Sequence, residues 1–217
     1  MGFKGTLRGF MFGGLALLVQ LGVAAASTTI VGLGDSLMAG YQLAPGESFP
    51  ERLESALRER GHDVAVTNAG VSGDTTSGGL ARLDWSVPDD TDLVILELGA
   101  NDMLRGLPPG TTEDNLDTMI ARLKDRGVVV VLAGMLAAPN LGADFADAFN
   151  AIFPRLAEKH DVALIPFFMD GVAANGGLLL ADGMHPNAEG VKRMVETALP
   201  VVEETLGALK PGAADHD

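Results

Sequence analysis

The sequence contains no cysteine, which excludes disulfide bonds, thiolate metal sites and a cysteine nucleophile. Positive charge is also scarce: 15 lysines and arginines stand against 29 aspartates and glutamates, and the net charge is −14. A nucleic-acid partner would require a basic face, and an anionic membrane would repel so acidic a protein. We therefore expect no nucleic-acid partner and no electrostatic docking on a membrane.

A long apolar run occupies residues 10–23. It follows Lys4 and Arg8 and precedes an alanine triplet that ends at Ala26, which is the three-part pattern of a secretory signal peptide. A membrane-spanning helix needs about 20 apolar residues, so a retained anchor is the weaker alternative. We predict that residues 1–26 are a signal peptide cleaved after Ala26, and that the protein is exported to the periplasm without a stable membrane anchor.

The remaining length suits one domain with a sizeable core. Hydrophobic residues make up 47% of the sequence and charged residues 20%, as in folded proteins rather than disordered ones. Neither an internal repeat nor a low-complexity linker divides the chain. We predict a single domain at residues 27–210, followed by a disordered acidic tail at residues 211–217.

Short apolar segments alternate with amphipathic ones throughout this domain. The apolar segments predict strands at residues 30–33, 64–66, 93–98, 128–132 and 162–167. Helical spacing and end signals predict helices at residues 49–60, 75–83, 112–126, 143–160 and from 186 onward. Pro154 is expected to kink the fourth helix, and Pro200 to bend or break the fifth. Such alternation predicts a parallel sheet in a three-layer α/β/α fold.

Polar loops follow the first, second, third and fifth strands, at the sheet edge where open α/β folds bind ligands. Ser36 follows the first strand, and a serine hydroxyl becomes a good nucleophile only when a base takes its proton. His185 could take that proton, and Asp182 could hold the imidazole in the required tautomer. Taken singly, each of these residues could instead be an ordinary turn or helix-cap residue.

Acyl transfer also needs fixed hydrogen-bond donors for the oxyanion of the tetrahedral intermediate. The candidates are the backbone N–H groups of Ser36 and Gly73 and the side-chain amide of Asn101. Asp35 and Asp74 lie in the same loops, where aspartate commonly braces the backbone through hydrogen bonds. We expect these two residues to support the loops rather than to react.

Four blocks of the sequence resemble, in order, those of the GDSL or SGNH hydrolases. They are Gly34-Asp35-Ser36-Leu37, Gly73, Gly99-Ala100-Asn101-Asp102 and Asp182-Gly183-Met184-His185-Pro186. One block alone would be weak support, but four in the right order are specific. The resemblance implies that Ser36, Asp182 and His185 form a catalytic triad, and that Gly73 and Asn101 complete the oxyanion hole. It also implies a flavodoxin-like fold whose five-stranded parallel sheet has the order 2-1-3-4-5.

The resemblance is strongest to the secreted bacterial arylesterases, acyl-CoA thioesterase I and lysophospholipases. It implies a serine esterase that cleaves carboxylic esters or thioesters through an acyl-enzyme intermediate. We expect apolar side chains from residues 136–141 and 171–180 to hold a simple acyl chain near the active end of the sheet. The individual substrate-binding candidates are Leu107, Pro139, Asn140 and Leu141.

Two alternatives remain: a carbohydrate acetylesterase of the same family, and a non-catalytic exported protein that binds acyl chains or lipids. The complete set of site residues argues against the carrier, which would not need all of them. Leu37 occupies the third glycine position of a dinucleotide-binding fingerprint, and no G-x-S-x-G surrounds Ser36. Histidine spacing suits no metal site, so we expect no cofactor, and we expect a monomer that acts on a small-molecule ester or thioester.

Overall fold

Five parallel strands form one sheet in the order β2-β1-β3-β4-β5 in the computed structural model, which describes residues 1–2 and 27–209. The strands are β1 (Thr28–Gly34), β2 (Val64–Gly70), β3 (Leu93–Glu97), β4 (Val129–Ala133) and β5 (Ala163–Ile165). The expected α/β fold and strand order are confirmed. The predicted signal peptide from residue 3 onward and the predicted acidic tail lie outside the described residues.

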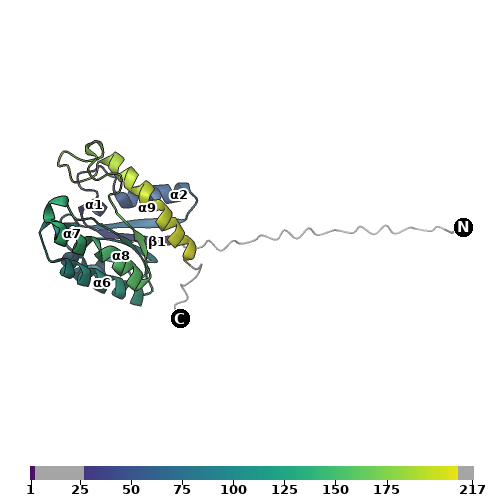
Figure 1. The fold of residues 1–217 in the computed structure, drawn as a ribbon. Helices are drawn as coiled ribbons and strands as arrows, with labels where there is room; N and C mark the ends of the chain where they lie inside the picture. The colour runs from purple at the N-terminus through teal and green to yellow at the C-terminus, as the bar shows by residue number, and fades with distance from the viewer. Residues whose placement is uncertain (3–26, 210–217) are drawn as a thin grey trace.

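Helices cover both faces of the sheet (Figure 1). On one face, α2 (Phe49–Glu59) packs beside α9 (Ala188–Ala208); on the other, α6 (Pro109–Asp125) contacts α3 (Thr76–Ala81) and α8 (Ile152–His160). The shorter helical segments are α1 (Ser36–Ala39), α4 (Leu83–Ser86), α5 (Ala100–Leu104), α7 (Ala143–Asn150) and the 3-10 turns η1 (Pro139–Leu141) and η2 (Gly176–Leu178). None of the helices described here combines the length and apolar character needed to cross a bilayer.

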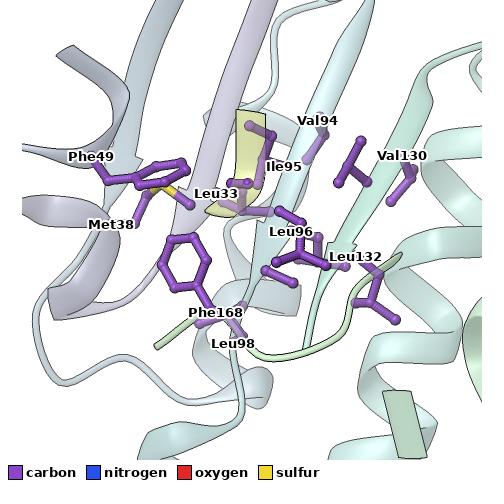
Figure 2. Close-up of a cluster of buried hydrophobic side chains, with 14 of the residues drawn as sticks. Leu33, Met38, Phe49, Val94, Ile95, Leu96, Leu98, Val130, Leu132 and Phe168 are labelled. Carbon is purple, nitrogen blue, oxygen red and sulfur yellow. The ribbon is translucent and has the colours of Figure 1, made fainter. Parts of the chain in front are cut away.

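The core lies on both faces of the central strands. All five residues of β3 are buried, as expected of a parallel strand that is covered on both sides. Beside it, Leu33, Met38, Phe49 and Phe168 form a continuous apolar cluster (Figure 2), in which the two phenylalanine rings meet edge to face with centroids 4.7 Å apart. Because Met38 belongs to α1, this packing anchors the segment that begins at the carboxyl end of β1.

The two internal prolines do not act as expected. The predicted helix over residues 143–160 is divided at Ala151 rather than kinked at Pro154. Pro154 is the third residue of α8, where a backbone N–H would have no acceptor within the helix, so proline costs no hydrogen bond there. Helix α9 runs through Pro200 without a break; this residue lies on the exposed side of the helix, where water can satisfy the freed carbonyl.

Several element boundaries also differ from the expectation. Strand β2 continues to Gly70, well beyond residue 66, because it pairs with β1 as far as Gly34. The predicted helix over residues 75–83 is divided into α3 and α4, and α6 begins at Pro109 instead of residue 112. Two single-turn helices, α1 and α5, stand where only turns were expected. Both carry residues of the candidate site.

Candidate active site

Ser36 is the first residue of α1, directly after β1. The carboxylate of Asp35 caps this helix by accepting the N–H of Leu37 at 3.0 Å, which confirms its expected bracing role. Gly40 ends the helix in the left-handed conformation, and its N–H donates to the carbonyl of Ser36. The Ser36 side chain is therefore held at a short, doubly capped turn at the carboxyl edge of the sheet.

A closed turn presents His185. The Asp182 Oδ1 atom accepts the backbone N–H groups of Met184 at 2.9 Å and His185 at 3.0 Å. The N–H of Leu180 donates to the carbonyl of His185 at 2.8 Å and closes the loop across its base. Because one oxygen of Asp182 holds the backbone, its other oxygen is free to meet the imidazole.

The three residues expected to form a triad lie in hydrogen-bond contact. His185 Nδ1 lies 2.7 Å from Asp182 Oδ2, and His185 Nε2 lies 2.8 Å from Ser36 Oγ. The two backbone N–H groups and the imidazole lower the pKa of Asp182 to about 2. Asp182 therefore remains a carboxylate throughout the pH range in which a histidine titrates.

Tyr41 is a neighbour of the imidazole that the sequence analysis did not identify. Its ring lies over His185, with centroids 4.4 Å apart and planes inclined by 38°. The N–H of Tyr41 donates to the carbonyl of Ser36, so the turn that carries the serine also positions this ring. An aromatic residue shortly after the G-D-S-L block gives no sign in the sequence of the distant residue that it contacts.

Gly73 lies in the loop after β2 and has a φ of +83°, which favours glycine. Its carbonyl accepts a hydrogen bond from Arg105 at 2.6 Å, whereas its N–H donates to no acceptor within residues 27–209. Asn101 lies in α5, and its Nδ2 donates one hydrogen to Asp35 Oδ2 at 2.8 Å. The second amide hydrogen remains available for a ligand.

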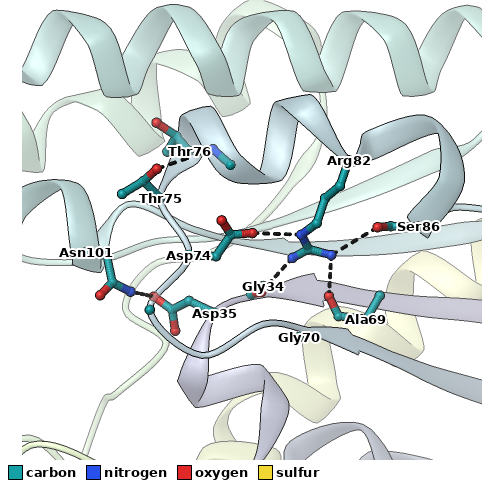
Figure 3. A network of polar contacts seen from close by, with 12 residues as sticks. Gly34, Asp35, Ala69, Gly70, Asp74, Thr75, Thr76, Arg82, Ser86 and Asn101 are labelled. Carbon is teal, nitrogen blue, oxygen red and sulfur yellow. Dashed lines mark hydrogen bonds and ion pairs between the residues drawn. The ribbon is translucent and has the colours of Figure 1, made fainter.

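Arg82 ties the loops of the site together, and the sequence analysis did not identify it (Figure 3). Its guanidinium is almost fully buried and makes an ion pair with Asp74 at 2.7 Å. It also donates to the carbonyls of Gly34 at 2.9 Å and Ala69 at 2.8 Å, and to Ser86 Oγ at 3.1 Å. Arg82 thus joins the end of β1, the end of β2 and the Gly73 loop.

The buried carboxylate of Asp102 joins the start of α3, directly after the Gly73 loop, to α5. Asp102 accepts the Thr76 N–H at 2.8 Å and the Thr76 hydroxyl at 2.6 Å. Its neighbour Asn101 is thereby fixed relative to the loop that carries Gly73. The polar contacts around the site come from four separate strand ends, as expected at the carboxyl edge of an open sheet.

Comparison with known proteins gives the chain its family. A model of the GDSL-like Lipase/Acylhydrolase family matches residues 33–193. The chain belongs to this family. It is 46% identical to the arylesterase of Vibrio mimicus over 177 residues, which cover 81% of this chain and 88% of that relative. The crystal structure of AlinE4, an SGNH-hydrolase family esterase, has a TM-score of 0.70 at 46% identity and covers 83% of this chain and 97% of its own.

A relative whose name covers several activities supports the same family. The chain is 38% identical over 195 residues to thioesterase 1/protease 1/lysophospholipase L1 of Escherichia coli K12, across 89% of this chain and 88% of that relative. As a member of the GDSL-like family with these esterase relatives, the chain is a serine esterase of the SGNH type.

The four substrate-binding candidates of this esterase lie in loops at the carboxyl ends of β3 and β4. Leu107 lies between α5 and α6, whereas Pro139, Asn140 and Leu141 form η1. Pro139 and Asn140 are exposed, and Leu141 packs partly against the core. No hydrogen bond joins them to the triad within the part of the chain that the structure describes. Nor does this part contain a cluster of three or more side chains arranged to hold a metal ion.

Proposed function

We propose that Ser36 Oγ attacks the carbonyl carbon of the ester or thioester. His185 Nε2 accepts the hydroxyl proton as the C–O bond forms, and then donates it to the departing alcohol or thiol. Asp182 holds the imidazole through Nδ1 and stabilises its cation. The observation that carries this proposal is the chain of contacts from Ser36 to His185 to Asp182, at 2.8 and 2.7 Å.

The acyl-enzyme formed in this way is then hydrolysed by water. His185 removes a proton from the water, the hydroxide adds to the acyl carbon, and the proton returns to Ser36 as the carboxylic acid departs. The oxyanion of each tetrahedral intermediate is bound by the N–H groups of Ser36 and Gly73 and by the amide of Asn101. Two observations support this hole: the N–H of Gly73 donates to no acceptor among the described residues, and the amide of Asn101 is oriented by Asp35.

Replacement of Asn101 with alanine is expected to lower kcat about 10²–10³-fold, as the loss of one oxyanion donor usually does. KM should change little, because the interaction is strongest in the transition state. Steady-state kinetics on an aryl ester measure both constants. Thr118→Ala provides a control on α6, because it removes an exposed hydroxyl that donates to the Asp114 carbonyl within the same helix. Unchanged kcat in the Asn101 variant would exclude this residue from the hole.

We further propose that this esterase acts on aryl esters, acyl thioesters and lysophospholipids with simple acyl chains. Relatives named arylesterase and thioesterase/lysophospholipase support this range. Leu107, Pro139, Asn140 and Leu141 would contact the acyl chain from the loops after β3 and β4. Parallel kcat/KM values for an aryl ester, an acyl thioester, a lysophospholipid and an acetylated sugar test the proposal. A marked preference for the sugar would instead favour the acetylesterase alternative.

Export is proposed from the sequence of the first 26 residues, with cleavage after Ala26. In a bacterial host, intact-mass measurement of the protein from the periplasmic fraction should find a chain that begins at Ser27. Recovery of the full-length chain from the cytoplasmic fraction would contradict this proposal. Gel filtration of the same sample tests the expected monomer.

A further inference from the structure

Glu97 is a buried acid that the reaction as proposed does not use. It is the last residue of β3, in the middle of the sheet, and its exposed fraction is 0%. Glutamate is almost never fully buried without a partner, because burial removes its charge from water. The described residues place no lysine, arginine or histidine in hydrogen-bond contact with it. The question is what holds this carboxyl group in the core beside the active site.

The contacts of Glu97 lead to the turn that carries Ser36. Glu97 Oε2 accepts the backbone N–H of Asp35 at 3.2 Å, which brings the two side-chain carboxyl groups close enough for each to shift the pKa of the other. A Cβ at Gly34 would lie 2.5 Å from Glu97 Oε2, so only glycine allows this close approach. Within residues 27–209, no N–H or O–H group donates to Glu97 Oε1. One proton shared between the two carboxyl groups would remove the repulsion between two buried negative charges.

The other partners of Asp35 indicate where this proton resides. Asp35 Oδ1 accepts the Leu37 N–H at 3.0 Å, and Oδ2 accepts the Asn101 amide at 2.8 Å. Burial raises the pKa of the Asp35 carboxyl, but both of these contacts favour its ionised form, because each requires an acceptor oxygen. In the part of the chain that the structure describes, Glu97 receives one backbone N–H, from Asp35. Because two adjacent buried carboxylates repel each other strongly, the proton belongs on Glu97.

We propose that Glu97 is a neutral carboxylic acid that donates its O–H to the Asp35 carboxylate, and that this pair positions the Asn101 amide. Glu97 is then a positioning residue: it touches Asp35, Asp35 orients Asn101, and Asn101 meets the oxyanion. The proposal depends on the role of Asn101 proposed above. Because Glu97 is neutral, the Asp35–Glu97 pair carries one negative charge rather than two beside the oxyanion hole.

The surroundings of this pair contain few other charges. His185, in the loop before α9, acts on Asp35 electrostatically when it is protonated, and Arg82 binds the Gly34 carbonyl while paired with Asp74. Burial, and secondly the charge of Asp35, raise the pKa of Glu97 well above its usual range. The folded protein therefore retains a proton that the unfolded chain loses above its ordinary pKa. Stabilisation by this proton decreases as the pH rises from the unfolded to the folded pKa.

Glu97→Gln tests the proton directly, because glutamine keeps a neutral donor and cannot ionise. Infrared spectra of the wild-type protein at neutral pH should contain a carboxylic-acid C=O band that Glu97→Gln lacks. The difference in Tm between the variant and the wild type should also shift in favour of the variant as the pH rises from 5 to 9. If the variant does not fold, if no band is lost, or if the Tm difference does not change with pH, the proposed neutral acid is contradicted.

The positioning role has a separate kinetic test. Glu97→Asp shortens the side chain by one methylene and so moves its carboxyl group away from Asp35. Because Asn101 is then misplaced, kcat should fall about 10–100-fold. KM should change little, and Glu97→Gln should keep kcat near the wild-type value. In the Asn101→Ala background, Glu97→Asp should have little further effect. An equal effect in both backgrounds, or wild-type kcat in Glu97→Asp, would overturn the positioning role.

If Asn101→Ala alone leaves kcat unchanged, the proposed oxyanion hole fails, while the infrared result still decides the protonation of Glu97.

Discussion

Ser36→Ala should lower kcat about 10⁴–10⁶-fold, because the residues of a triad act as a unit and the remaining groups cannot form an acyl-enzyme. The side chain is small, and among the described residues its hydroxyl forms a hydrogen bond with one side chain, His185. The substitution should therefore leave the fold intact. A continuous assay of ester hydrolysis by the purified variant measures this decrease in kcat.

Ser55→Ala is the matched control, because it removes the hydroxyl of an exposed serine on α2. It should keep the wild-type rate. Circular dichroism should give the same spectrum for the wild type and both variants. Wild-type turnover by Ser36→Ala would exclude Ser36 as the nucleophile.

Arg82→Met should lower the free energy of unfolding by about 3–5 kcal/mol, the usual cost of removing one partner of a buried ion pair. Arg82 and Asp74 have side chains that are only 8% and 12% exposed, so the remaining Asp74 carboxylate would be left without its partner. The carbonyls of Gly34 and Ala69 would also lose their donor. Urea denaturation at neutral pH measures the change.

An exposed arginine supplies the comparison for this prediction. Arg122 pairs with Asp84 on the surface, where the two side chains are 42% and 68% exposed. Arg122→Met should therefore change the free energy of unfolding by about 0–1 kcal/mol. If Arg82→Met costs no more than Arg122→Met, Arg82 does not hold the loops of the site together.

The fold was largely predictable because its signals are local. Apolar runs bounded by polar loops marked all five strands, and their alternation with helices required a parallel sheet. The strand order came from the family resemblance, since alternation alone does not fix it. Where the helices end or continue was less predictable. Helix α9 continues through Pro200, and this depends on which side of the helix faces water. The length of β2 depends on its pairing with β1 as far as Gly34.

The family blocks led to the residues proposed for the site, such as Ser36 and His185, which lie in contact in the structure. Residues that act through long-range contacts were missed. Arg82 meets Gly34 from 48 positions away, and Tyr41 meets His185 across nearly the whole domain. Glu97 did carry a signal, because it is one acid within an otherwise apolar strand. Its meaning depends on Asp35, 62 positions away, which the sequence does not show as a neighbour.

The most direct test of the account is the covalent labelling of Ser36 by a fluorophosphonate. Intact-protein mass spectrometry of the treated protein should find one adduct, and peptide mapping should locate it on Ser36. His185→Ala should not be labelled under the same conditions, because its serine lacks the base at 2.8 Å. Absence of an adduct in folded wild-type protein, or an adduct on another residue, would contradict the proposed triad.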